Sequence, residues 1–150
     1  MSKTFHFPSF SMVAGDITVN ISLNRFEKQF QEAQNWLDGQ VFTDMEKYMP
    51  FRDGNMRNVS AIMSRSMQGS GRVIAGAPPY GRFLYEGKVM MDPATGSPWA
   101  RAGAKKVATD RDLVFDKTAH PRATDNWFDA AKTENVKSWV KGVKRIAGGK

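Results

Sequence analysis

The chain of 150 residues contains no cysteine. This absence excludes a disulfide scaffold, a thiol nucleophile, and zinc or iron–sulfur sites that depend on cysteine ligands. Long apolar segments are missing as well, because no run approaches the roughly 18 residues that a membrane-spanning helix needs. The first 12 residues lack the apolar stretch of a signal peptide. We therefore expect a protein with no membrane partner that folds in a reducing compartment.

Patterns of metal ligands and nucleophiles are also scarce. The 2 histidines, His6 and His120, are far apart, and neither has a second ligand at the spacing of a metal site. The glycine-rich stretch 69–71 lacks the flanking residues of a phosphate-binding loop, and no GxSxG motif is present. Three neighbouring carboxylates lie among basic residues, where charge balance accounts for them better than acid–base catalysis; they are Asp110, Asp112 and Asp116. We expect no catalytic residues, no metal and no cofactor.

The composition is that of a folded protein with excess positive charge. Hydrophobic residues make up 41% and charged residues 25%, as in a globular chain, and the length fits one domain. The net charge is +7, and residues 101–150 contain 12 basic and 6 acidic residues. This basic region favours an acidic protein partner, or a solvated face with no partner, over sequence-specific DNA binding, because no DNA-reading motif accompanies it.

The N-terminal part predicts an arm followed by a strand. Apolar and polar residues alternate over 17–23, which predicts a half-buried strand. Before it, residues 1–16 contain Phe5, Phe7 and Phe10 around a proline, in a segment too short to fold alone. Such an arm packs either on its own domain or on a neighbouring subunit, and both interpretations remain open.

A long amphipathic helix is predicted over residues 24–49. Asn24 is a candidate N-cap with Glu27 three residues later, a pattern close to a capping box. Apolar residues then recur at helical spacing: they are Phe26, Phe30, Ala33, Leu37, Val41 and Met45. Asp38 and Gly39 form a candidate break, and the following proline, at position 50, is expected to end the helix.

The middle of the chain predicts short strands and one short helix. Residues 59–67 and 73–75 are expected to form a β-hairpin around a turn at 68–71. A single helical turn over 82–86 is expected to stop at the glycine that follows. Residues 88–91 are the next candidate strand.

The last third predicts a loop, a strand and a helix. Residues 92–111 are rich in turn residues, and loops of about 20 residues are uncommon unless functional or mobile. Residues 113–115 are expected to return as a strand opposite 88–91. A C-terminal helix from about 124 to 146 places apolar residues on one face and basic residues in its last turns.

This order of elements predicts the fold class. We expect an α+β fold, with an antiparallel sheet built from hairpins and packed against a long N-terminal helix and a C-terminal helix. Residues 1–16 form the N-terminal arm, residues 17–150 form a single domain, and 92–111 is its extended loop.

One block, residues 80–99, reads YGRFLYEGKVMMDPATGSPW. It resembles the minor capsid, or tail-completion, proteins of long-tailed bacteriophages. Weaker blocks at 50–60 and 126–139 are similar to the same family, so the resemblance covers residues of about 45–146. The chain departs from the family pattern at Phe83, where a second tyrosine is usual, and in its aromatic N-terminal arm.

The resemblance implies a structural virion protein without enzymatic activity. Family members form rings, most commonly hexamers, at the head–tail junction, or neck, of the virion, which is assembled in the host cytoplasm. The implied partners are further copies of the chain, the neighbouring connector or stopper protein, and the tail terminator or tail tube protein. Phage DNA passes through such a junction, so a passing contact with DNA is also expected.

A rotational ring needs two different surfaces, which an aromatic arm and a long loop can supply. The candidate contact residues are Phe5, Phe7, Phe10, Pro93, Thr95, Pro98, Trp99, Arg101, Lys105 and Lys106. Three alternatives to the tail-completion role remain: a tail terminator or another neck ring, a basic nucleic-acid-binding module whose affinity falls steeply with salt, and, least favoured, a hydrolase that depends on Asp112 or His120.

Overall fold

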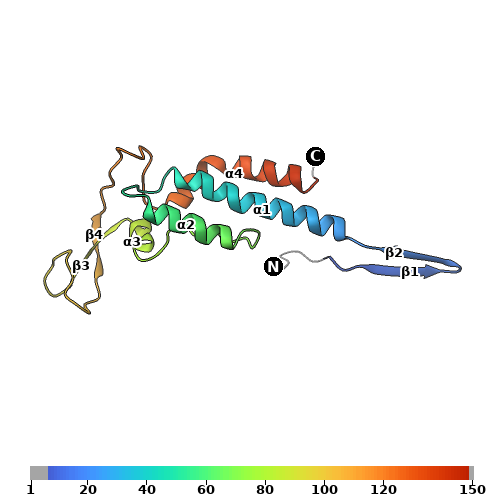
Figure 1. The fold of residues 1–150 in the computed structure, drawn as a ribbon, viewed down its shortest axis with the longest axis horizontal. Helices are drawn as coiled ribbons and strands as arrows, with labels where there is room; N and C mark the ends of the chain where they lie inside the picture. Colours follow the sequence, from blue (N-terminus) through green and yellow to red (C-terminus); the bar gives the residue numbers. More distant parts are fainter. Residues whose placement is uncertain (1–6, 149–150) are drawn as a thin grey trace.

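The computed structural model describes residues 7–148 as an elongated molecule with helices in the middle and a β-hairpin at each end (Figure 1). The elements in chain order are β1 (Phe10–Ala14), β2 (Ile17–Ile21), α1 (Asn24–Glu46), α2 (Asn55–Ser66), α3 (Gly81–Glu86), β3 (Lys88–Met91), β4 (Val107–Asp112) and α4 (Trp127–Ile146). The strands form two separate two-stranded antiparallel sheets, β1–β2 and β3–β4. The predicted α+β class, with hairpins and long helices near both termini, is confirmed.

The core lies between α1 and α4, which run along each other (Figure 1). Apolar side chains repeat along one face of each helix and meet between them; the buried ones include Val41, Phe42, Met45, Trp127, Ala131 and Trp139. At Gly142 of α4 the helices come so close that an added Cβ would lie 2.0 Å from the ring of Trp36. Trp139 Nε1 also donates a hydrogen bond of 2.8 Å to Asp44 Oδ2 on α1. The predicted helices therefore form the centre of the molecule by packing on each other.

Trp127, at the start of α4, joins this core to the chain between α2 and β3. Its side chain is fully buried, and its Nε1 donates to the carbonyl oxygen of Ala75 at 2.8 Å. The ring of Tyr85 from α3 meets it edge to face, with centroids 4.8 Å apart. A buried tryptophan needs a partner for its N–H, and the segment before α3 provides it.

The predicted hairpin over 59–67 and 73–75 is wrong. Residues Asn55–Ser66 are the helix α2, and 73–75 contain no strand. Ser60 and Ser64, one helical turn apart, explain the difference, because both face the segment that follows the helix. The Ala77 N–H donates to Ser60 Oγ at 2.8 Å, and the Ile74 N–H donates to Ser64 Oγ at 2.9 Å. The backbone N–H groups of this segment therefore bind serine hydroxyls, where the predicted hairpin would have paired them with a neighbouring strand.

Two predicted details of α1 are also wrong. Leu23, not Asn24, is the N-cap, and no side chain caps the helix. The Glu27 carboxylate instead accepts a hydrogen bond of 2.8 Å from the Phe7 N–H, so the arm takes the place of the capping box. The helix also continues without a break past Asp38, whose buried carboxylate accepts the N–H groups of the loop after α2, at Gly69 (2.8 Å) and Gly71 (3.1 Å). A residue type that favours turns is retained inside α1 because it binds that loop.

The second hairpin is confirmed with a shifted boundary. The single turn α3 ends at Gly87, which has φ +67°, and β3 follows as predicted. Its partner is β4 at 107–112 rather than 113–115, so the loop between the strands spans 92–106 and the predicted loop to 111 is too long. The strand predicted over 17–23 is also present as β2, but it is exposed along its whole length rather than half-buried.

Candidate assembly surfaces

The β1–β2 hairpin has one apolar face and one mainly polar face. Cross-strand partners point to the same side of a sheet, so the pairing assigns each side chain to a face. The pairs Phe10–Ile21, Met12–Val19 and Ala14–Ile17 form the apolar face, and Ser11–Asn20 and Val13–Thr18 form the opposite one. All ten residues are exposed. The hairpin projects beyond the N-terminal end of α1, away from the other helices (Figure 1), so its apolar face is uncovered.

Among the described residues of the arm, Phe7 fixes it to α1 just before the hairpin. The ring of Phe7 packs against Phe30 with centroids 5.5 Å apart, and its N–H binds Glu27 as described above. Of the three predicted arm aromatics, Phe7 therefore docks on its own chain and Phe10 is exposed on the apolar face of the hairpin. Phe5 lies outside the described residues.

Asp92 organises the loop between β3 and β4. Its side chain is buried and accepts hydrogen bonds from the Ala94 N–H at 2.9 Å and from Arg101 Nε at 3.0 Å. Backbone bonds of 2.8 Å from Asp92 N to the Ser97 carbonyl and from Gly96 N to the Asp92 carbonyl close the turn. The Arg101 guanidinium, and next the Ala94 N–H, hold the pKa of Asp92 below its usual range. The carboxylate therefore stays charged and keeps the loop in one shape.

The predicted contact residues of this loop lie on the outside of the shape that Asp92 imposes. Trp99 is 85% exposed, an unusual position for a tryptophan. The remaining ones are exposed as well: Pro93, Thr95, Pro98, Arg101, Lys105 and Lys106. Asp92 brings 93–101 together into one compact projection, while the two lysines follow on the chain that returns to β4. Asp92 itself was missed, although an aspartate followed by proline and glycine is a turn signal.

A second charged surface lies along α4. Its exposed basic residues are Lys132, Lys137, Lys141, Lys144 and Arg145. None of them forms an ion pair with another residue in the range 7–148. Because α1 covers the opposite side of the helix, these cations face solvent and produce much of the positive field of the C-terminal half.

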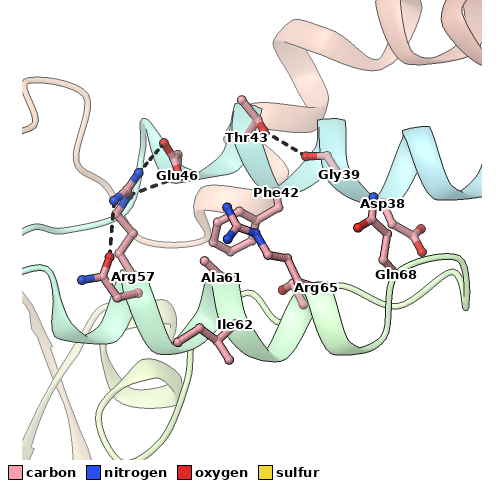
Figure 2. Close-up of a pocket in the computed structure, with 12 residues that line it drawn as sticks. Asp38, Gly39, Phe42, Thr43, Glu46, Arg57, Ala61, Ile62, Arg65 and Gln68 are labelled. Atoms are coloured by element: carbon pink, nitrogen blue, oxygen red, sulfur yellow. Dashed lines mark hydrogen bonds and ion pairs between the residues drawn. The ribbon is translucent and has the colours of Figure 1, made fainter.

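A groove of about 530 Å³ runs between α1 and α2 (Figure 2). Phe42 and Ala61 line it, and the ion pair between Arg57 and Glu46, 3.0 Å long, closes one end. Asp38 lines the other end, with its carboxylate engaged by the loop after α2. Both acidic groups are therefore used to hold α2 and its loop against α1, and the groove is best explained as a joint between helices.

The remaining candidates for chemistry have structural contacts. His120 Nδ1 donates to the Met49 carbonyl at 2.9 Å, and its ring packs on Phe51. Asp112 forms an ion pair with Lys88 across the β3–β4 hairpin. Residues 7–148 contain no group of three acidic, histidine or cysteine side chains able to hold a metal ion. In the same range, no helix is both long and apolar enough to span a bilayer.

These features define a small α+β protein whose most exposed elements are an apolar hairpin, a basic helix and the loop that the Asp92–Arg101 ion pair holds in shape. A sequence model of the minor capsid protein family matches residues 16–147, nearly the whole chain. The chain belongs to this family, and the predicted resemblance is confirmed. It is therefore a structural component of a phage virion. No curated protein and no solved structure matches the chain.

Proposed function

We propose that this chain is a non-enzymatic ring protein at the head–tail junction of a long-tailed phage, where it joins the connector to the tail as a tail-completion protein. The observation that carries the proposal is the pair of unlike projections at the two ends of the molecule. One is the exposed β1–β2 hairpin and the other is the loop between β3 and β4 (Figure 1). A ring with rotational symmetry uses heterologous contacts, so each subunit needs two different surfaces. The minor capsid family match over 16–147, which includes β2 and the loop, supports a role in the virion.

The neighbours in this proposal are further copies of the chain, most simply six in a ring, the connector or stopper protein on the head side, and the tail terminator or tube protein on the tail side. The loop over 92–106 is proposed as one of the two unlike surfaces through which copies of the chain meet in the ring. It is held in one shape by Asp92 while Trp99 is exposed, and a preorganised aromatic side chain is a typical anchor of protein interfaces.

Removal of the gene from the phage tests the proposed position. We expect filled heads and complete tails that do not join, and we expect added protein to restore joining in a mixed lysate. Cross-linking of intact particles should then connect the chain to a portal-side protein and to a tail-side protein. Cross-links to tail proteins alone would replace this role with that of a tail terminator. Normal infectious particles without the chain would overturn the proposal.

The α4 cations support a passing contact with an anionic partner, and DNA in the ring channel is the partner proposed here. Duplex DNA should bind weakly, and the affinity should fall steeply with salt, because cations that neutralise phosphates release counterions. Charge reversal at Lys137 and Lys141 should flatten that salt dependence, whereas reversal at Lys28 on α1 should not. An affinity independent of salt would refute a phosphate contact.

A further inference from the structure

We propose that the apolar face of the β1–β2 hairpin docks on a second copy of this chain, at the end formed by α3, β3 and β4. The inference rests on the proposed ring and specifies which surfaces close it. The hairpin is apolar on one face, but within residues 7–148 no part of its own chain covers that face. A two-stranded hairpin alone is marginally stable in water, yet this one projects past α1 with its apolar side chains exposed.

The size of the apolar face indicates a contact that is repeated. Five of its side chains, Phe10, Met12, Ile17, Val19 and Ile21, are each about 40–70% exposed, a patch on the order of 500 Å². A stable interface usually takes about 800 Å² from each partner. One hairpin falls short of this area. In a head-to-tail ring every subunit supplies one hairpin and receives another, so the buried area per subunit doubles and closure makes the contacts cooperative.

The opposite end of the same chain offers a matching surface. Figure 1 shows α3, β3 and β4 at the end of the molecule away from the hairpin. This end and the residues that border it expose apolar side chains on several elements: Tyr80, Phe83, Trp99, Val107 and Val114. Every copy thus carries an uncovered apolar hairpin at one end and uncovered apolar side chains at the other.

Charge favours the same partner. Within residues 7–23 the only charged side chain is Asp16, at the turn between β1 and β2. A surface with a single charge is poorly suited to DNA or to a highly charged protein. The receiving end exposes charges of both signs, and the chain leading into β4 contains Lys105 and Lys106, which are opposite in sign to Asp16. The family match begins at residue 16, so β1 lies outside it and family membership does not assign this contact.

Two valines on opposite faces of the hairpin provide a matched test. Val19 lies on the apolar face, and Val13 lies on the other face and is more exposed, at 68% against 41%. Self-association of the full chain is measured by sedimentation and light scattering over a range of concentrations. Val19→Lys should weaken assembly at least about 30-fold, because it places a charge in the centre of a buried patch. Val13→Lys should weaken it less than about 3-fold.

The absence of cysteine allows the contact to be located directly. Met12→Cys provides a unique thiol for a photo-cross-linker, and assembly from a mixture of ¹⁵N-labelled and unlabelled chains separates contacts between copies from contacts within one. We expect cross-links between copies, from position 12 to residues 80–114. Cross-links only within one chain, to another part of the neighbouring copy or to a different virion protein would overturn the inference, as would equal effects of the two valine variants or a wild-type chain that never assembles.

The proposed function has a separate readout. If the chain is found at the neck of purified particles but Val19→Lys assembles normally, the docking inference fails and the position in the virion stands. If the chain is absent from the neck but Val19→Lys abolishes self-association while Val13→Lys does not, the docking contact stands and the proposed position fails. The two results are therefore independent.

Discussion

Replacement of Ser60 by alanine tests the packing of α2 more sharply than any change to its apolar residues. Ser60 is fully buried, and its hydroxyl donates to the Met56 carbonyl at 2.7 Å and accepts the Ala77 N–H at 2.8 Å. Within residues 7–148 the Ala77 N–H has no other hydrogen-bond partner, and because Ala77 is 1% exposed, water cannot readily replace the lost hydroxyl. An unsatisfied buried donor costs about 1–3 kcal/mol. For a chain of this size, each kcal/mol corresponds to roughly 2–4 °C in Tm.

Ser66→Ala is the matched control, because it makes the same change on the same helix. The Ser66 hydroxyl is exposed and donates only to the Met63 carbonyl, so no other group loses a partner. We expect Ser66→Ala to stay within about 0.5 kcal/mol of wild type, while urea unfolding followed by circular dichroism shows the loss for Ser60→Ala with an unchanged m-value. Equal stability of the two variants would refute the assignment of Ser60 as the link between α2 and the 73–77 segment.

Three further predictions concern the helix interface and the loop. Gly142→Ala should lower Tm through an overpacking cost of about 1–3 kcal/mol, because its Cβ would collide with the Trp36 ring; a Tm equal to wild type would mean that this ring moves aside at no cost. Trp139→Phe should destabilise by about 1–3 kcal/mol, because it leaves a buried carboxylate on α1 without its indole donor; calorimetry measures this, and no loss would contradict it. Because the folded-state pKa of Asp92 is lowered, its contribution to loop stability is complete above its unfolded pKa of about 3.9 and is lost as pH falls through the folded value. In wild type, amide exchange at the loop should therefore become faster only in acid. In Arg101→Ala it should already be faster at neutral pH. Equal protection of the two proteins at pH 7 would exclude a stabilising role for the Asp92–Arg101 ion pair.

The elements that were predicted correctly are those whose signals are local. The long helices show apolar residues at helical spacing, and α3 ends at a glycine with positive φ. The failure at 59–75 has a different origin. Val59 and Ile62 favour strands by propensity, but the segment forms a helix, in which Ser60 and Ser64 lie one turn apart and both accept N–H groups of the chain that follows. Their spacing was visible in the sequence, whereas the backbone segment that binds them was not.

In the candidate surfaces, too, local sequence signals predicted the elements but not the contacts between distant residues. Turn residues over 92–98 predict a loop, and the structure confirms a loop there. Its shape depends on an ion pair between Asp92 and Arg101, nine positions apart, which no local propensity encodes. The break predicted at Asp38 failed for a related reason, since its carboxylate binds backbone N–H groups more than 30 residues away. Polar residues that act over such distances are recognisable only when the fold brings their partners to them.

The exposed hairpin shows what alternation along a strand does and does not determine. The alternation at 17–21 predicts a strand with one face to bury, and the register with β1 confirms that such a face exists. Alternation does not say which molecule covers the face. Phe7 marks the boundary, because it packs on Phe30 of its own helix, whereas Phe10, three residues later, faces solvent on the hairpin. An apolar face beyond the reach of its own core adds no stability to the monomer and favours aggregation. The proposed burial against another copy would account both for the alternation and for the near absence of charge. The Val13 and Val19 variants decide between that explanation and a merely exposed strand pair.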